Sequence, residues 1–565
     1  MLKRIFSKRN LPLWGAALLS GAIMYMAYPP APAGGRTGAF FALVPLLAAV
    51  RSGISPRKSA FFFFAAGMFF WPATLSWFPA IVPNGGPWPL VALGWFGLSA
   101  VCSLFFALFG WLDALLWKAA GDAPSWRRLP AVPAEAVLWA GVELLRGNIF
   151  TGFPWNFLGT PLGAFPKAAA LARFGGVYAV SALAVAVSGA MASFAARAVR
   201  PLAGLPPDPR TLRARLLRSA EAWLAFALAM ACFCIPPPAE VADADSETVN
   251  VVLLQRDFPC VFRRPDGKSR GAEVYRKLMM EARDATGRRV WCGADAAADG
   301  RFMQADLAVL PESALCEFGT ADASALLGWM VSSPGVSVLA GCDHAVRDAQ
   351  DGLRFYNSAL LADAMDPGAR PHIYSKRHLV PFGEYIPFDK TFPALQGLCP
   401  LGVSLWPGDR PVLDLRLRSG ADVKIAPLIC YEDAGASVVR ESAKAGAQLL
   451  AVITNDNWFW GSIEPVQHFE QSVFRAVETG LPLVRAGNTG VTGIVLPDGT
   501  RKTLDGPDGK PLVDAPGSMA CTVRVPKNPS PTPYTSLGDI PLAVLSSIAA
   551  AAALLQCARG RRRAA

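Results

Sequence analysis

The sequence predicts a polytopic α-helical membrane domain of about eight spans joined to an α/β domain outside the lipid. Of the 565 residues, 52% are hydrophobic and only 17% are charged, which is unusual for a soluble protein. Long apolar runs lie before about residue 236, a charge-rich stretch follows from about 240 to 535, and one apolar run comes last. This distribution indicates a membrane domain, a soluble domain and a C-terminal anchor.

Hydropathy sets the expected number of spans. A spanning helix needs roughly 20 mostly apolar residues, and the candidate runs are centred near residues 20, 44, 70, 103, 139, 185, 228 and 547. Two runs, 38–50 and 222–235, are short enough to be re-entrant or interfacial segments instead. We expect Glu143 and Arg146, one helical turn apart in one span, to pair with each other because unpaired charges are costly there.

Basic residues predict the orientation of the chain, because Lys and Arg collect on the cytoplasmic side of bacterial membrane proteins. If all eight runs cross, the same side receives the basic stretches at 3–9, 51–58, 118–128, 197–218 and 559–563. We therefore expect residues 1–236 to hold about seven spans, 237–536 to lie outside the cytoplasm, and 537–565 to form a last span with a basic cytoplasmic tail. The net charge of +11 then reflects topology and not nucleic-acid binding.

The stretch 237–536 has the pattern of a layered α/β core, in which short β-rich runs alternate with longer helical ones. The predicted strands are 249–255, 307–310, 336–340, 423–429, 449–453 and 483–485, and the predicted helices are 271–285 and 466–479. Where strands end in reactive residues, their side chains meet at one edge of a sheet, and loops can shape a site around them.

Three segments carry candidate catalytic residues. Glu312 follows an apolar strand and a proline, and Cys430 follows an apolar strand directly. Lys376 lies in an aromatic and apolar setting, eight residues before Glu384. Taken alone, each of these residues could have a purely structural role, since a cysteine after an apolar strand is more often a buried core thiol. Together they supply a general base, a fixed positive charge for an oxyanion and a nucleophile, which is what acyl transfer through a thiol requires.

Cysteine and histidine usage gives little support to a metal site, and we expect no metal and no cofactor. The stretch 237–536 has seven of the eleven cysteines but no C-x-x-C pair, and the whole chain has four histidines. In an oxidising compartment an odd number leaves at least one thiol free. A disulfide between Cys260 and Cys292, which bracket most of a polar insertion, is a hypothesis.

The order Glu, Lys, Cys in these contexts resembles the nitrilase superfamily, whose domains are α-β-β-α sandwiches. Over nearly the whole chain the sequence resembles one branch of it, the apolipoprotein N-acyltransferase family. The soluble segments that carry this resemblance are K-x-H-L-V-P-F-G-E at 376–384, C-Y-E at 430–432, T-N-D at 454–456, W-F at 458–459, Q-H at 467–468 and R-A-G-N-T-G at 485–490. In the membrane part they are E-L-L-R-G at 143–147 and T-G-F-P-W at 151–155.

The resemblance implies a two-step acyl transfer at the periplasmic side of the bacterial inner membrane. Cys430 would take an acyl chain from a phospholipid as a thioester and pass it to the α-amino group of the diacylglyceryl-cysteine of an apolipoprotein. Glu312 would be the base and Lys376 would stabilise the oxyanion. The residues expected to support the site are Glu384, Tyr431 and Glu432. The enzyme is expected to be a monomer in contact with membrane lipid.

Two questions stay open at this point. An apolar entrance for acyl chains is one interpretation of Trp155, Phe382, Trp458, Phe459 and Trp460. The other is that these aromatic side chains are ordinary interfacial anchors. Two rival functions are a membrane-tethered amidase or hydrolase that releases the acyl group to water, and a catalytically inactive scaffold. Eight spans argue against the first rival, and the intact Glu, Lys and Cys argue against the second.

Overall fold

The computed structural model describes residues 7–29, 33–120, 129–199, 220–236, 238, 242–259, 271–290, 302–316, 320–333, 335–348, 352–389, 391–392, 394–395 and 402–564. The chain forms two compact units. The helical unit comprises Met1–Phe78, Pro89–Pro237 and Leu537–Ala565. The sheet unit comprises Pro238–Ser536 and also the short segment Pro79–Trp88, which lies between two helices of the helical unit along the chain.

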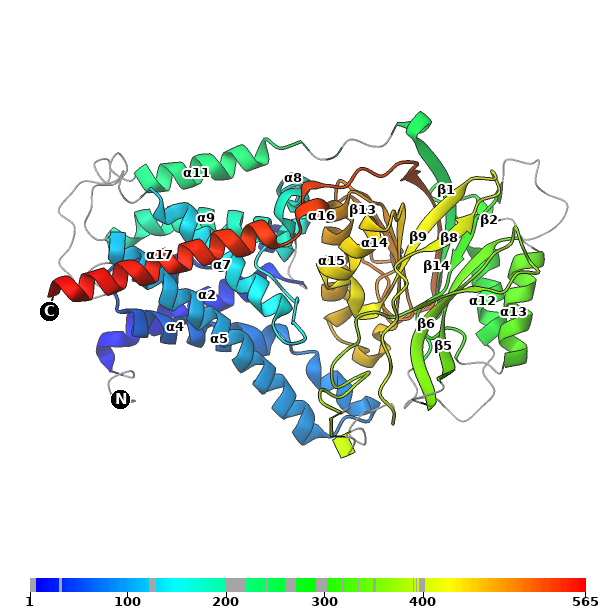
Figure 1. Ribbon diagram of the computed structural model, residues 1–565, viewed down its shortest axis with the longest axis horizontal. Helices are drawn as coiled ribbons and strands as arrows, with labels where there is room; N and C mark the ends of the chain where they lie inside the picture. The colour runs from blue at the N-terminus through cyan, green and yellow to red at the C-terminus, as the bar shows by residue number, and fades with distance from the viewer. Residues whose placement is uncertain are drawn as a thin grey trace. The chain divides into compact units, whose positions relative to one another are not determined.

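The helical unit is a bundle of mostly apolar helices (Figure 1). Its α-helices are α2 (Leu11–Ala27), α3 (Val44–Arg51), α4 (Pro56–Thr74), α5 (Trp88–Ala120), α7 (Ala131–Asn148), α8 (Pro166–Ala169), α9 (Ala172–Val199), α11 (Ala220–Phe233) and α17 (Ile540–Ala564). Its 3₁₀ helices are η1 (Lys8–Asn10), η2 (Ala33–Phe40) and η4 (Thr160–Ala164). Small residues let helices approach closely, as where Gly67 faces Ser103 and where Gly141 of α7 faces Ser546 of α17.

Not all eight predicted spans are supported by helix length and composition. Among the described residues, three helices are long and apolar enough to cross a membrane: Pro56–Asn84, Trp88–Lys118 and Ala172–Ser193. Leu11–Ala27 and Ile540–Leu555 are shorter apolar helices. The run near residue 44 becomes η2 and the eight-residue α3, and an α-helix of that length extends only about 12 Å.

The expected pairing of Glu143 with Arg146 is wrong. Among the described residues no ion pair joins them, and both side chains bind the backbone of the loop that follows α7. Glu143 accepts a hydrogen bond from the Leu158 N–H at 2.7 Å, and Arg146 donates to the carbonyls of Phe153 and Trp155 at 2.8 Å each. Loop carbonyls and N–H groups inside an apolar bundle need partners, and the two charged side chains provide them.

The sheet unit is built from two six-stranded sheets. The first has the order β14-β1-β4-β5-β6-β7 and the second has the order β13-β12-β11-β10-β9-β8. The strands of the first are β1 (Ser246–Gln255), β4 (Leu307–Val309), β5 (Ser337–Asp348), β6 (Gly352–Ala362), β7 (His372–Ser375) and β14 (Gly517–Pro526). Those of the second are β8 (Leu413–Arg416), β9 (Asp422–Ile429), β10 (Leu449–Thr454), β11 (Leu483–Gly487), β12 (Gly493–Val495) and β13 (Arg501–Thr503).

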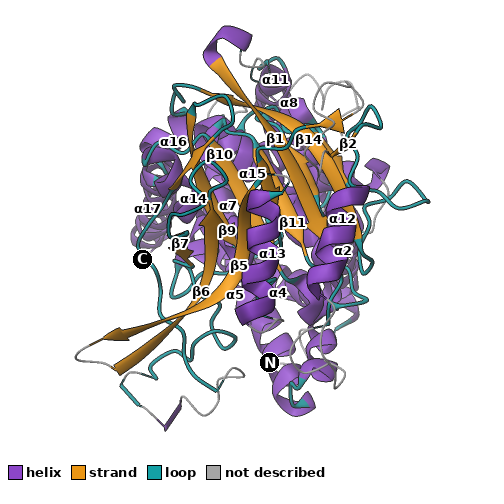
Figure 2. Cartoon of the chain, turned by 90° about the vertical axis from the view of Figure 1, so that its right-hand side faces the viewer, coloured by secondary structure: helices purple, strands orange, loops and turns teal. Residues whose placement is uncertain are grey.

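Helices cover the outer face of each sheet. Helices α12 (Gly271–Glu281) and α13 (Thr320–Ser332) lie on the first sheet, and Figure 2 shows them in front of its strands. Helices α14 (Ala436–Lys444) and α15 (Glu464–Thr479) lie on the second. The shorter elements are β2 (Arg289–Val290), β3 (Phe302–Met303), α16 (Pro533–Leu537), η3 (Phe78–Asn84), η6 (Asp243–Asp245), η9 (Cys430–Asp433) and η10 (Asp456–Phe459). The result is the predicted α-β-β-α sandwich.

Strand β10 shows why the central strands are continuously apolar. Leu449, Ala451 and Ile453 face the core between the sheets, whereas Leu450 and Val452 face the helices. Because successive side chains of a strand point to opposite faces, a strand covered on both faces must be apolar at every position. All six predicted strands and both predicted helices are present, although the first helix ends at Glu281 and not at residue 285.

Candidate active site

Three strand ends bring the candidate catalytic side chains into one cluster, in which Glu312 and Lys376 are buried and Cys430 is half-buried. Glu312 lies three residues after β4, whereas Lys376 directly follows β7 and Cys430 directly follows β9. We call the predicted triad of Glu312, Lys376 and Cys430, together with the supporting Glu384, the triad cluster. Its three charged members are 1–9% exposed, so the electrostatic interactions between them are only weakly screened by water.

Glu312 is held by two hydrogen bonds, one to each carboxylate oxygen. The side-chain amide of Asn357 donates to Oε1 at 2.7 Å, and the backbone N–H of Asn455 donates to Oε2 at 2.8 Å. Burial raises the pKa of this carboxyl group, and Glu384 raises it further, while Lys376 opposes both. A carboxylate with a raised pKa is a better proton acceptor than an exposed one.

Lys376 is fixed by Glu384, whose Oε1 lies 2.9 Å from Nζ. Asn357 donates to the same Oε1 at 2.9 Å, and the Val380 N–H donates to Oε2 at 2.8 Å. Burial by itself would lower the pKa of the ammonium group, but Glu384, Cys430 and Glu312 raise it above its ordinary value. Lys376 is therefore a permanent positive charge beside the sulfur.

Cys430 is the first residue of η9, directly after β9, and has a φ of 51°. Non-glycine residues rarely adopt this left-handed conformation, which costs of order 1 kcal/mol and is characteristic of functional sites. Burial raises the pKa of the thiol, as does Glu312, whereas Lys376 lowers it. The thiol is therefore protonated at rest and has a base and a cation within electrostatic reach.

The two residues after Cys430 have different surroundings. Glu432 is fully buried and accepts hydrogen bonds from the backbone N–H groups of Ile429, Arg377 and His378 and from the Tyr374 hydroxyl, at 2.7–3.1 Å. It thereby joins the turn that carries Cys430 to the segment that carries Lys376. Tyr431 is half-buried, and its ring stacks on that of His378 with centroids 6.0 Å apart.

The five candidate entrance residues are not alike. Phe382 is 66% exposed and Trp460 is 49% exposed, and both belong to the sheet unit. Trp458 and Phe459 are half-buried in η10. Trp155 belongs to the helical unit, where it is 2% exposed and packs against Trp77 and Phe153.

Sequence reasoning gave no role to three asparagines that organise this cluster, although Asn455 lies in the T-N-D segment quoted above. Asn357 of β6 bridges Glu312 and Glu384, and Asn455 donates its N–H to Glu312. Asn84, in the segment Pro79–Trp88 of the sheet unit, donates to the carbonyls of Asn457 at 3.5 Å and Trp458 at 2.7 Å. A polar residue inside the apolar strand β6 was a usable signal for Asn357. Nothing local marks Asn84, whose two partners in the active-site turn lie more than 370 residues away.

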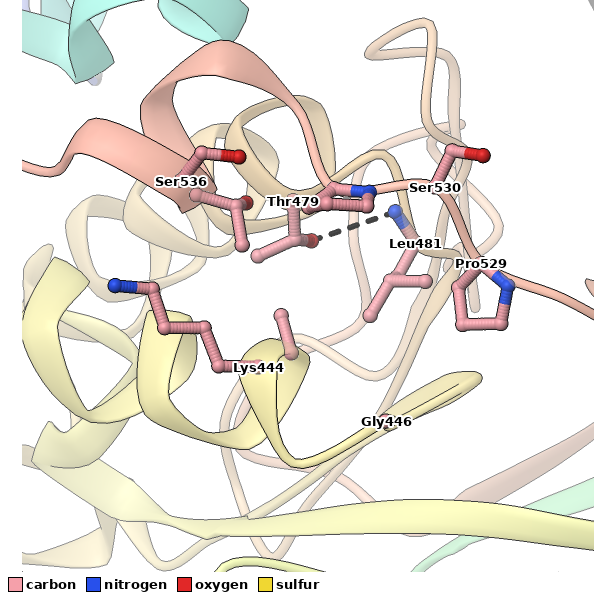
Figure 3. Close-up of a pocket in the computed structure, with 10 residues that line it drawn as sticks. Lys444, Gly446, Thr479, Leu481, Pro529, Ser530 and Ser536 are labelled. Carbon is pink, nitrogen blue, oxygen red and sulfur yellow. Dashed lines mark hydrogen bonds between the residues drawn. The ribbon is translucent and has the colours of Figure 1, made fainter.

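Other features carry less chemistry. Figure 3 shows an open pocket of the sheet unit, and among the predicted site residues none lines it. Its lining includes the exposed Lys444, beside the C-terminal ends of α14 and α15. Cys316, Cys342, Cys430 and Cys521 are free thiols. Cys260 and Cys292, of the disulfide hypothesis, lie outside the described residues.

Comparison with known proteins gives the family. Residues 20–190 match the model of the apolipoprotein N-acyltransferase N-terminal domain, and residues 272–517 match that of carbon-nitrogen hydrolases. The apolipoprotein N-acyltransferase of Sinorhizobium medicae is 30% identical over 90% of this chain and 91% of its own length. That of Methylococcus capsulatus is 30% identical over 93% and 92%, and that of Rhizobium meliloti 32% over 76% and 74%. This chain therefore belongs to the apolipoprotein N-acyltransferase family.

Proposed function

We propose that this protein transfers a fatty acyl chain from a phospholipid, through a thioester on Cys430, to the α-amino group of the diacylglyceryl-cysteine at the N-terminus of apolipoproteins. The observation that carries the proposal is the meeting of the buried Glu312 and Lys376 with the half-buried Cys430 in one cluster, in a chain of this family. The relatives reported above carry the name of the transferase, and no described feature favours the amidase alternative.

In the first step Glu312 accepts the proton of the Cys430 thiol, and the thiolate attacks the ester carbonyl of the phospholipid. The carbonyl oxygen becomes an oxyanion beside Lys376, whose charge is fixed by Glu384. The tetrahedral intermediate collapses to the thioester, and the lysophospholipid leaves as an alcohol with the proton from Glu312.

In the second step the amine of the acceptor attacks the thioester, and Glu312 accepts the proton that the nitrogen loses. The second oxyanion forms at the same place, so Lys376 serves both steps. Collapse then releases Cys430, which recovers its proton from Glu312. Glu432 and Tyr431 shape the turn of Cys430, and the exposed Phe382 and Trp460 are the strongest of the five entrance candidates.

Both substrates carry acyl chains, and exposing these chains to water would cost roughly 0.8 kcal/mol per CH₂. This cost supports a membrane location. We propose that the chain has eight spans in the bacterial inner membrane, with residues 1–236 and 537–565 as its membrane parts and 237–536 on the periplasmic side. We further propose that it acts as a monomer, without a metal or a cofactor.

A transfer assay tests the proposed function. The purified protein is mixed with a phospholipid that carries an isotope-labelled acyl chain and with a diacylated lipopeptide whose N-terminal amine is free. We expect the label to appear in an amide on the lipopeptide, detected by mass spectrometry. An N-acetylated lipopeptide is the matched control and should receive none. Label recovered only as free fatty acid would contradict the proposal and support the hydrolase.

A further inference from the structure

A buried asparagine that the reaction described above does not use lies directly after β11. This residue, Asn488, is fully buried, and Asn455, which directly follows β10, is nearly so. The two strands are parallel neighbours in which Thr454 pairs with Gly487. The Asn488 N–H donates to the Thr454 carbonyl at 2.9 Å. Because the two chains leave the sheet at paired positions, the strand register brings the two asparagines together.

The side-chain amide of Asn488 makes three hydrogen bonds. Its oxygen accepts from the Phe258 N–H at 2.9 Å. Its NH₂ group donates to the Phe258 carbonyl at 2.7 Å and to Asn455 Oδ1 at 2.9 Å. Since a backbone N–H can only donate and a carbonyl can only accept, the amide fits here in one orientation. The two bonds to Phe258 therefore orient Asn488, and its second N–H hydrogen then holds Asn455.

Asn455 is held by its side chain, whereas its backbone contacts the general base. Its Oδ1 accepts from Asn488 and also from the Asn457 N–H at 3.3 Å. Its own N–H donates to Glu312 Oε2 at 2.8 Å. The pairing of β10 with β9 ends at Ile453, so this N–H lies beyond the strand pairing. Rotation about the N–Cα bond would move the side chain relative to the N–H group, so the two bonds to Oδ1 fix the direction of the N–H.

We propose that Asn488 is a positioning residue for the general base, because it holds Asn455 so that the Asn455 N–H faces Glu312. The proposal rests on the proposed function, since it takes Glu312 as the base. Among the described residues no hydrogen bond joins Asn488 to Glu312 directly, so its effect passes through Asn455.

The charges around Glu312 explain why one neutral donor matters. The groups that face this carboxylate are Lys376 after β7, Glu384 in the loop that follows, and Cys430 after β9. Lys376 favours the carboxylate, whereas burial and Glu384 oppose it. A hydrogen bond to the charged form of a group favours that form. Without a well-aimed Asn455 N–H the pKa of Glu312 is higher, and at a given pH less of it can accept the thiol proton.

The test is the pH dependence of Cys430 acylation by phospholipid micelles in the full-length protein, without an acceptor, followed by intact mass spectrometry. In Asn488→Ala we expect the acidic limb of the rate profile to move up by about one pH unit. On that limb the rate constant falls about tenfold, whereas KM for the phospholipid stays unchanged. A purely structural role would lower the amount of protein that becomes acylated and leave the limb in place.

Gln448→Ala is the matched control. Gln448 directly precedes β10, whereas Asn455 directly follows it. The buried amide of Gln448 also makes three hydrogen bonds to the backbone, because it accepts from the Lys424 N–H and donates to the carbonyls of Pro526 and Lys527. We expect this variant to unfold more easily and to keep the acidic limb of the wild type.

Asn455→Ala breaks the same contact from its other side, because it removes Oδ1 and keeps the backbone N–H. It should move the limb as Asn488→Ala does, and the double variant should show no further shift. If Asn488→Ala does not fold, Asn455→Ala decides alone. An unmoved limb in either folded variant, a further shift in the double variant, or an equal shift in Gln448→Ala would overturn the proposal. Failure of the proposed function is distinguishable, since the wild type itself would then form no adduct.

Discussion

The charged residues of the triad cluster are buried, and so are those of a second group, Asp433, Asp456, His468 and Arg485, which we call the histidine cluster. In the histidine cluster two cations meet two carboxylates, and each partner is held by direct ion pairs. In the triad cluster one cation, Lys376, serves two carboxylates and a thiol. The charges of the histidine cluster balance, and we expect the loss of one partner to destabilise the fold. The triad cluster has one cation for two carboxylates, and a site that exchanges a proton and holds an oxyanion needs such an imbalance.

The largest effect is expected from breaking the triad cluster. Lys376→Met removes the cation that the triad cluster offers to the oxyanion and should lower the rate of acyl transfer at least about 100-fold, as loss of an oxyanion donor does. The rate is measured with labelled phospholipid and a diacylated lipopeptide. Lys444→Met, at an exposed lysine of the same unit, should keep the wild-type rate. A Lys376→Met variant within tenfold of wild type would show that another group stabilises the oxyanion.

Disrupting the histidine cluster should mainly lower the free energy of unfolding. His468→Gln leaves Asp433 and Asp456 with Arg485 as their one cation, and removal of one partner from a buried pair costs about 3–5 kcal/mol. Chemical denaturation, followed by tryptophan fluorescence, measures the loss. His372→Gln changes an exposed histidine and should have no effect. If both variants unfolded at the same denaturant concentration, the charges of the cluster would contribute nothing to the fold.

The pH dependence of stability sharpens the comparison. Since the pKa of His468 is raised from 6.5 to about 10 on folding, its stabilising contribution is complete below pH 6.5 and disappears as the pH rises towards 10. The difference in unfolding temperature between wild type and His468→Gln should therefore shrink over this range. A constant difference from pH 6 to pH 10 would mean that His468 is neutral in the folded protein.

The turn at 454–459 joins the two clusters, and Asn84 holds it. Asn455 reaches Glu312, Asp456 reaches His468, and the carbonyl of Trp458 accepts from Asn84. Asn84→Ala leaves that half-buried carbonyl without its amide partner, so we expect about a tenfold loss of transfer rate. Asn148→Ala removes an exposed amide at the end of α7 and is the control. Unaltered transfer in Asn84→Ala would show that the turn holds its shape without this contact.

The smallest effect is expected at the entrance. Phe382 and Phe388 are both exposed and both have positive φ angles, 62° and 69°. Asparagine tolerates this conformation, so Phe382→Asn and Phe388→Asn change the side chain with little backbone strain. We expect only Phe382→Asn to raise KM for the phospholipid, by a few fold, with kcat unchanged. Equal KM values in the two variants would remove Phe382 from the entrance.

The sandwich and the reactive strand ends could be predicted because their signals are local. An apolar run followed at once by Cys430, or by Pro311 and Glu312, places a reactive side chain at a strand end. The order of the strands is not local, because β1 pairs with β14 across some 270 residues. The same reason hides Asn84 and the bond from Asn455 to Glu312. The pairing of Glu143 with Arg146 was predicted wrongly because only the two charges were considered. The carbonyls and N–H groups of the following loop bind these side chains instead.

The central claim is that Cys430 carries the acyl group. Intact mass spectrometry of the protein in phospholipid micelles tests it most directly, with wild type beside Cys430→Ala. The account predicts one acyl adduct on the wild type, none on the variant, and loss of the adduct when a diacylated lipopeptide with a free amine is added. An equal adduct on Cys430→Ala, or no adduct on reduced wild type with fresh lipid, would contradict it.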